Sequence, residues 1–167
     1  MLLVCLLPLL LLLSSCLSQP TARSCPDEPG WLNTDSSCYL VSHVKMTWFE
    51  AQEFCFGKEA YLAEIQSHEE DSLLDIMLPE DTNYWLGLSD LAVEGRFVWE
   101  DSHSVAVYTG WAPGQPDNIG TNLLTRNADC VFKSFRISQG EAGWHDVECA
   151  AVDWHGSNHA LCEYDKV

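Results

Sequence analysis

The sequence of 167 residues predicts an α+β fold, with two helices flanking antiparallel sheets, a long functional loop and three disulfides. Three observations lead to this prediction. Two helix-capping patterns lie close together in the first half of the chain. From Asn83 onward, short apolar or aromatic runs are separated by Gly, Pro, Asn and Asp, which is typical of strands joined by loops. Six cysteines lie beyond the first 18 residues, and an even number in a secreted chain indicates disulfides.

The N-terminus has the pattern of a secretory signal. Residues 2–13 are apolar and include Pro8, a run too short to cross a hydrocarbon layer of about 30 Å at 1.5 Å per residue. Cys16 and Ser18 fit the small-residue pattern that precedes a cleaved bond. We therefore predict a signal peptide over residues 1–18, a secreted, extracellular protein without a membrane anchor, and one domain over residues 25–165.

The charge balance excludes two classes of partner. The chain has 8 Lys and Arg against 25 Asp and Glu, for a formal net charge of −17. Such a chain cannot build the basic surface that nucleic acid or an anionic membrane requires. Its expected charged partners are cations.

The first predicted helix begins with a capping box formed by Thr47 and Glu50. The helical period then places Trp48, Ala51 and Cys55 on one stripe. We expect this stripe to face the core over about three turns.

The second predicted helix begins with a capping box formed by Ser67 and Glu70, and Pro79 ends it. Its inward side chains are expected to be the apolar ones of the last turns: Leu73, Leu74, Met77 and Leu78. Short apolar runs then predict the strands: Tyr61–Ile65 between the helices, and Tyr84–Leu88, Phe97–Trp99, Val105–Tyr108, Cys130–Phe135 and Ala160–Tyr164 after them.

The segment Ala112–Asn127 has no apolar period and is rich in Gly, Pro and Asn. A structureless loop of about 16 residues inside a compact domain is more often functional than not. Oxygen-bearing side chains crowd it and the residues after it: Gln115, Asp117, Asn118, Asn122, Asn127, Asp129 and Asp146. Calcium takes six to eight such oxygens, so this segment is a candidate Ca²⁺ site; the alternative is a solvated polar loop.

The sequence gives less support to a zinc site or to catalysis. His68 and Glu69 resemble the start of a zinc-protease motif, but Ser72 occupies the position of its second His. His155 and His159 are separated by Gly-Ser-Asn, which disfavours a helix that would align them. We therefore expect no enzyme. Six cysteines allow 15 pairings, and counting alone does not choose among them.

The ordered motifs of the chain resemble those of the C-type lectin-like domain family, over roughly Cys25 to Tyr164. The motifs that carry the resemblance are Trp85-Leu-Gly-Leu88, Glu94-Gly-Arg-Phe97, Trp99-Glu-Asp101, Trp111, Gln115-Pro-Asp117, Cys130, Trp144-His-Asp146, Cys149 and Cys162. The resemblance implies that family's double-looped α/β fold. It also implies three disulfides, Cys55–Cys162, Cys130–Cys149 and an N-terminal Cys25–Cys38.

The resemblance further implies a calcium site whose ligands also bind two vicinal sugar hydroxyls. Its ligands fall on Gln115 and Asp117, joined by a Pro that is cis in the family, and on Asp146. The order Gln…Asp is similar to that of galactose-preferring members. A second family calcium position falls on residues in and around the same loops: Asp90, Glu94, Asn118 and Asp129.

Two residues depart from the family pattern. Ala128 stands where the family has a Glu, and His145 stands where it has an Asn after the Trp. Asn127 is the candidate replacement ligand, and weaker calcium binding is expected. A hydrogen bond from His145 to sugar would make binding change between about pH 5 and 7. The tryptophans of the motifs, Trp85, Trp99, Trp111 and Trp144, are expected in the core.

The expected function is therefore that of a secreted, single-domain lectin that binds galactose-type or microbial surface glycans with Ca²⁺, with a role in innate-immune pattern recognition implied by the resemblance. Two rivals remain. A lectin-like domain without sugar binding would recognise a protein, or ice, and a zinc site would centre on His145 and Asp146 with His155 or His159. Single shallow sugar sites bind weakly, so useful avidity would need several copies in a homo-oligomer.

Overall fold

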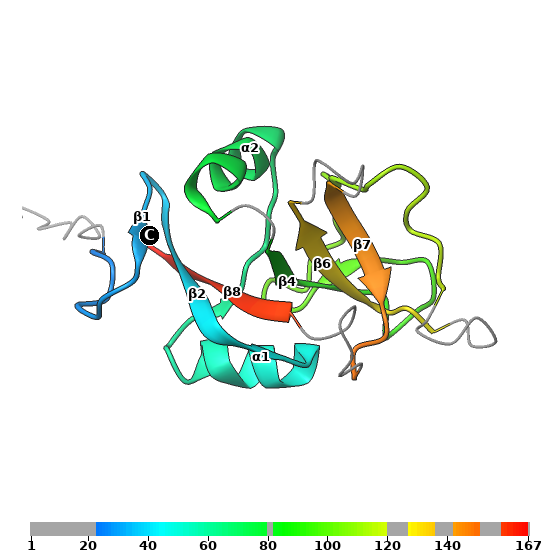
Figure 1. The fold of residues 1–167 in the computed structure, drawn as a ribbon, viewed down its shortest axis with the longest axis horizontal. Helices are drawn as coiled ribbons and strands as arrows, with labels where there is room; N and C mark the ends of the chain where they lie inside the picture. Colours follow the sequence, from blue (N-terminus) through cyan, green and yellow to red (C-terminus); the bar gives the residue numbers. More distant parts are fainter. Residues whose placement is uncertain (1–22, 80–81, 120–126, 136–141, 151–157, 167) are drawn as a thin grey trace, which may run out of the picture.

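The computed structural model describes residues 23–79, 82–119, 127–135, 142–150 and 158–166. Helices α1 and α2 pack around a twisted sheet, and the long loop and its neighbours form the opposite end of the molecule from β1 (Figure 1). The elements in chain order are β1 (Leu32–Asn33), β2 (Ser37–Met46), α1 (Trp48–Phe56), β3 (Tyr61–Leu62), α2 (His68–Met77), β4 (Asn83–Ser89), β5 (Val98–Trp99), β6 (Cys130–Ser134), β7 (Gly143–Val147) and β8 (Asn158–Asp165). The predicted signal peptide lies outside the described residues.

The described strands form one sheet in the order β1-β2-β8-β4-β6-β7, with β3 added on β8 and β5 on β4. The sheet is mixed, which differs from the antiparallel expectation. Strand β8 enters between β2 and β4 and runs parallel to β4, with Tyr84 opposite His159 and Trp85 opposite Ala160. The other pairs are antiparallel, including β6 with β7, where Val131 faces Asp146.

Helix α1 forms as its sequence predicts. The Thr47 side chain accepts a hydrogen bond from the Glu50 backbone, and the Glu50 carboxylate accepts one from Thr47 N, which completes the capping box. Trp48, Ala51 and Cys55 are its buried residues. The Trp48 indole donates to the Leu86 carbonyl at 2.8 Å, so the helix is attached to the middle of β4.

Helix α2 begins after Ser67 and stops before Pro79 as predicted, but its inward face is different. Asp71 and Leu74 are buried in the helix, and Leu78 is buried just after it. The prediction that Leu73 points inward is wrong, because its side chain is 40% exposed. The helix is rotated so that Asp71, which pairs with a buried lysine, occupies the inward stripe three residues before Leu74.

The predicted strand Val105–Tyr108 is also wrong. Val105 makes only an isolated bridge to Val98, next to a hydrogen bond from Ala106 N to the Phe97 carbonyl, and no strand forms over the residues that follow. Tyr108 instead donates its hydroxyl proton to Asp71 at 2.8 Å, so this segment packs against α2 rather than continuing the sheet. Strands β1, β2 and β7 were not predicted.

Three disulfides have the expected pairing: Cys25–Cys38, Cys55–Cys162 and Cys130–Cys149. Trp85, Trp99 and Trp144 are in the core as predicted, whereas Trp111 is half-buried against it. No helix among the described residues is long and apolar enough to cross a membrane.

The two ends of the described chain lie together. Arg23 N donates to the Lys166 carbonyl at 2.7 Å, and Lys166 N donates to the Ser36 carbonyl at 3.1 Å. Both contacts lie at the β1 end of the molecule, away from the long loop (Figure 1).

Candidate functional site

The first part of the long loop, which precedes its candidate ligands, is hydrogen-bonded to β7. Ala112 N donates to the Trp144 carbonyl at 3.0 Å, and Trp144 N donates to the Gly110 carbonyl at 2.8 Å. Gly143 makes this approach possible, because a Cβ there would lie 2.7 Å from Ala112 N. The backbone of the loop is therefore positioned directly beside the strand that carries Asp146.

A tight turn follows and positions the first candidate ligand, Gln115. Gln115 N donates to the Ala112 carbonyl at 3.0 Å, and Gly114 at the third position has φ 90°. Pro at the second position and Gly at the third are the residues that a type II turn favours. The Gln115–Pro116 peptide bond that follows is cis, as the family resemblance implies.

Gln115, Asp117 and Asp146 come together in the structure. The Gln115 amide donates to the Asp117 carboxylate at 3.0 Å, and the Gln115 amide oxygen accepts from Asp146 N at 3.3 Å. The Asp146 carboxylate, on β7, accepts from Asp117 N at 3.0 Å and from Asn118 N at 2.7 Å. The side chain of a strand thus holds the loop backbone in place, a contact that the sequence did not predict.

Asn118 connects this group to the residues just before strand β6. It has a left-handed φ of 53°, which Asn tolerates better than most residues, and its amide oxygen accepts from Ala128 N at 3.0 Å. Ala128 is only 1% exposed, and Asn127 beside it is exposed. The position where the family has a Glu is therefore filled by a buried methyl group.

A second group of acids lies next to the first. Asp90 N donates to the Asp129 carbonyl at 3.0 Å, and Gly95 N donates to the Asp90 carboxylate at 2.7 Å. The other Asp90 oxygen, Oδ1, is buried and has no hydrogen-bond partner in the part of the chain that the structure describes. Asp90 and Asp129 are buried, whereas Glu94 is exposed.

These carboxylates repel one another. Burial, with smaller contributions from Glu94 and Asp129, raises the pKa of Asp90 to about 6. Burial also raises the pKa of Asp129, with Glu94 and Asp146 adding to the rise. The pKa of Asp146 is raised by burial as well, although the hydrogen bonds from the loop backbone oppose that rise.

The donors fit a hard cation in kind, because carboxylate and amide oxygens are what calcium prefers. The unpartnered Asp90 Oδ1 is a buried acceptor for which a cation would compensate. However, the candidate ligand side chains do not all converge on one point. Among the described residues, no three Asp, Glu, His or Cys side chains are grouped closely enough to hold a metal. Asn122 and His155 lie outside the described residues.

Among the residues that the structure describes, the geometry does not assemble the zinc alternative around His145. The His145 ring stacks on Phe132, with centroids 5.1 Å apart and an interplanar angle of 10°. His159 Nδ1 lies 2.7 Å from the Ser42 carbonyl on β2. Strands β4 and β6 separate His159 on β8 from His145 on β7.

A network of charged side chains connects α2 with strands β6 and β7, and it was not predicted from the sequence. Lys133 Nζ on β6 lies 2.6 Å from Asp71 and 2.7 Å from Asp75 of α2. The Trp144 indole donates to the same Asp71 carboxylate at 3.4 Å. Lys133 stands as a lone basic residue within the apolar run Cys130–Phe135, and that was the available signal.

Comparisons with known proteins identify the family. The model of the lectin C-type domain family matches residues 44–164. Perlucin of Haliotis laevigata is 36% identical over 141 residues, which cover 83% of this chain and 83% of perlucin. The low affinity immunoglobulin epsilon Fc receptor of Mus musculus is 32% identical over 142 residues and 83% of this chain, but these cover only 38% of the receptor's length.

Solved structures give the same result. The carbohydrate-recognition domain of the mouse scavenger receptor C-type lectin has a TM-score of 0.72 and 28% identity, over 86% of this chain and 100% of that domain. A calcium-independent type II antifreeze protein has a TM-score of 0.68 and 25% identity, over 87% of this chain and 98% of that protein. Since the family model matches most of the chain and the fold and disulfides agree with it, the protein belongs to the C-type lectin domain family.

Proposed function

We propose that the protein is a secreted lectin that binds galactose-type or microbial surface glycans in a calcium-dependent manner and acts in innate-immune pattern recognition. The observation that carries this proposal is that Gln115 and Asp117, which stand on either side of a proline with a cis peptide bond, both contact Asp146 in a chain of this family. Secretion is supported by the three disulfides, which persist in oxidising compartments, and by the short apolar N-terminal run.

The proposed ligands divide into two sets. Gln115, Asp117, Asn127 and Asp146 would hold one Ca²⁺, and Asp90, Glu94, Asn118 and Asp129 a second. A bound calcium supplies coordination positions for two vicinal sugar hydroxyls. The carboxylate and amide oxygens beside it accept the hydroxyl protons, and the Gln115 amide can donate to a sugar oxygen. His145, half-buried on Phe132, lies next to Asp146 and is the proposed additional sugar contact.

The first experiment separates metal binding from sugar binding. The disulfide-intact protein is titrated with Ca²⁺ by calorimetry, and it is then applied to immobilised galactose and mannose with and without chelator. We expect calcium binding in the millimolar range or tighter, retention on galactose and release by chelator. A folded protein that ignores millimolar Ca²⁺ would contradict the calcium mechanism.

A series of variants tests which ligand set is needed for calcium binding and for retention on galactose. Asp146→Asn keeps the size of the side chain but removes charge, so retention on galactose should fall at least tenfold. Asp90→Asn should lower calcium binding at the second set with a smaller effect on retention. Asp27→Asn, at an exposed position near the N-terminal disulfide, removes the same charge and should leave both measurements unchanged.

A second candidate function is recognition of a protein ligand without calcium. The buried methyl group of Ala128 favours it, because the first ligand set lacks one carboxylate. The two hydrogen bonds from the loop backbone to Asp146 favour it too, since they order the loop without a metal. Retention on a ligand that survives chelator would support this function over the first.

A further inference from the structure

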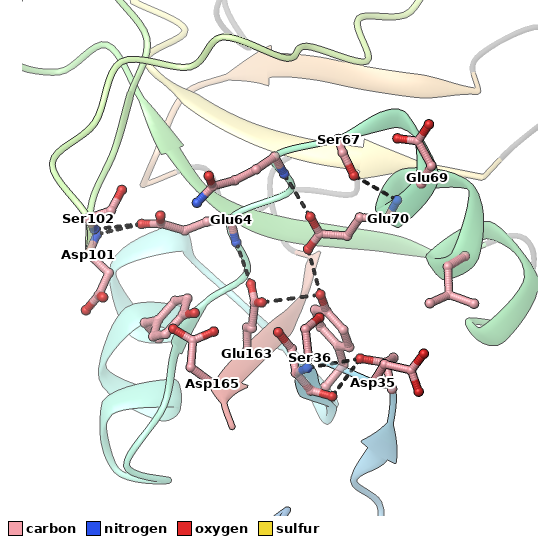
Figure 2. Close-up of a pocket in the computed structure, with 16 residues that line it drawn as sticks. Asp35, Ser36, Glu64, Ser67, Glu69, Glu70, Asp101, Ser102, Glu163 and Asp165 are labelled. Carbon is pink, nitrogen blue, oxygen red and sulfur yellow. Dashed lines mark hydrogen bonds between the residues drawn. The ribbon is translucent and has the colours of Figure 1, made fainter. Parts of the chain in front are cut away.

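A concave region lies at the opposite end of the sheet from the long loop. It is a cavity of about 480 Å³ between α2, β2, β3 and β8 (Figure 2). Seven carboxylates line it: Asp35, Glu64, Glu69, Glu70, Asp101, Glu163 and Asp165. None of its described lining residues is Lys, Arg or His.

Hydrogen-bond geometry singles out one group of residues in this cavity. The Tyr39 hydroxyl of β2 lies 2.6 Å from Glu70 Oε1 of α2 and 3.3 Å from Glu163 Oε1 of β8. A phenol has one proton to donate. With both carboxylates ionised, Tyr39 can therefore satisfy only one of them, and the other faces it without a shared proton.

A single added proton satisfies the whole group. If Glu163 is protonated on Oε1, it donates to the Tyr39 oxygen, and Tyr39 donates to Glu70. The other Glu163 oxygen already accepts from Glu64 N at 3.1 Å, and the other Glu70 oxygen accepts from Gln66 N at 2.9 Å (Figure 2). Glu70 lies in the first turn of α2, where the helix dipole favours a negative charge.

The surroundings of Glu163 also favour its neutral form. Its side chain is buried, and the titratable groups that face it are acids and phenols: Glu70 from α2, Tyr39 from β2, Tyr61 from β3 and Asp165 from β8. Its other hydrogen-bond partners are the Ser37 side chain of β2 and the Glu64 backbone of the β3–α2 connection. Burial, and then the charges of Glu70 and Asp165, raise the pKa of Glu163 to about 7, against lowering by hydrogen bonds from Ser37 and Glu64.

We propose that Glu163, Tyr39 and Glu70 form a proton-operated clamp between the first turn of α2 and strands β2 and β8. The clamp is closed when Glu163 takes a proton from solvent and loosens when Glu163 ionises. On ionisation, two carboxylates face each other across one hydroxyl without a cation to neutralise them. The contact of Glu70 with Tyr39 of β2 is then weakened, while Asp71 in the same turn keeps its contacts with Lys133 and Trp144.

The sign of the pH effect follows from proton linkage. The pKa of Glu163 rises from 4.5 to about 7 on folding, so the folded protein holds a proton that the unfolded chain has released between these values. The contribution to stability is complete below about pH 4.5 and is lost as the pH rises through about 7. In that window, this residue alone increases the unfolding equilibrium constant by up to about tenfold per pH unit.

The test compares Glu163→Gln with the native protein from pH 4 to 9 in urea unfolding. Gln resembles the protonated carboxyl group, since it can donate to Tyr39 and accept from Glu64 N. We expect the ratio of native to variant unfolding constants to rise with pH up to about 7 and then to level off. Glu69→Gln, an exposed acid of the same cavity and helix turn, is the control and should give a constant ratio.

Hydrogen exchange locates the effect. After correction for intrinsic exchange rates, the amides of Gln66 and Glu70, which donate to the Glu70 carboxylate and to the Ser67 side chain, should lose protection between pH 5 and 8 in the native protein but not in Glu163→Gln. Equal pH profiles for the native protein and Glu163→Gln would overturn the proposal. Should that variant fail to fold, carboxyl carbon NMR of the native protein decides: titration of Glu163 near neutral pH supports the clamp, and titration near pH 4.5 refutes it.

Discussion

At the scale of single residues, Ala128 is where this chain differs most from a complete calcium site. Its side chain is 1% exposed, and its backbone N–H is held by Asn118. A carboxylate placed there would be buried, which costs free energy unless a cation neutralises it.

We therefore predict that Ala128→Glu is less stable than the native protein without calcium and recovers when Ca²⁺ is added. Calcium titration followed by thermal unfolding measures this, because a ligand that binds only the folded state raises the melting temperature. Ala128→Gln matches the size without the charge and should show a much smaller response. Equal responses of the two variants would mean that no cation reaches this position.

The sequence predicted which side chains come together at the long loop, but not the contacts that they make. Gln115, Asp117 and Asp146 follow from motif order, and the structure brings them together. That Asp146 binds the loop backbone could not be predicted, because it depends on the path of the loop after the cis bond. The Glu163 clamp could not be predicted either, because its members lie 31 and 124 positions from Tyr39 along the chain.

At the scale of elements, α2 connects two distant parts of the molecule. Glu70 faces the acidic cavity, while its neighbour Asp71 contacts Lys133 of β6 and Trp144 of β7. Lys133 is 3% exposed, so its charge depends on these carboxylates for compensation. The position of α2 therefore depends on polar contacts as much as on Leu74.

We predict that Asp71→Asn lowers the free energy of unfolding by about 3 kcal/mol, since it leaves a buried lysine partly uncompensated and weakens the contacts of Tyr108 and Trp144. Urea unfolding followed by tryptophan fluorescence measures the loss. Asp75→Asn removes the other carboxylate near Lys133, but that side chain is 53% exposed, so a loss below about 1 kcal/mol is expected. Equal losses of unfolding free energy for Asp71→Asn and Asp75→Asn would contradict this prediction.

Local signals explain which elements were predictable. Both helices follow from their capping residues, Thr47 and Ser67, because capping is decided within one turn of chain. Strand β7, Gly143–Val147, was missed because it is short and contains polar residues that only the site explains. Strand β2 was missed because its last four residues, His43 to Met46, are exposed or half-buried and lack a simple alternation.

At the scale of the whole molecule, the disulfides connect segments that are far apart in sequence. Cys55 of α1 and Cys162 of β8 are 107 positions apart, whereas Cys25 and Cys38 are 13 apart. In the chain-entropy account, the longer loop restricts the unfolded state more.

We predict that replacing Cys55 and Cys162 by Ala destabilises the protein by about 4–5 kcal/mol, and that replacing Cys25 and Cys38 costs about 3 kcal/mol. Urea unfolding under non-reducing conditions gives both values. A larger loss for the Cys25–Cys38 pair would show that packing around that bridge, rather than chain restriction, dominates its effect.

The adjacency of Arg23 and Lys166 has a practical consequence for arranging many copies. A tether, fluorophore or scaffold attached at either end would emerge from the face that points away from the long loop (Figure 1). Arrays built in this way would present every loop outward in the same orientation, so the spacing between neighbours could be varied without blocking access to any of them.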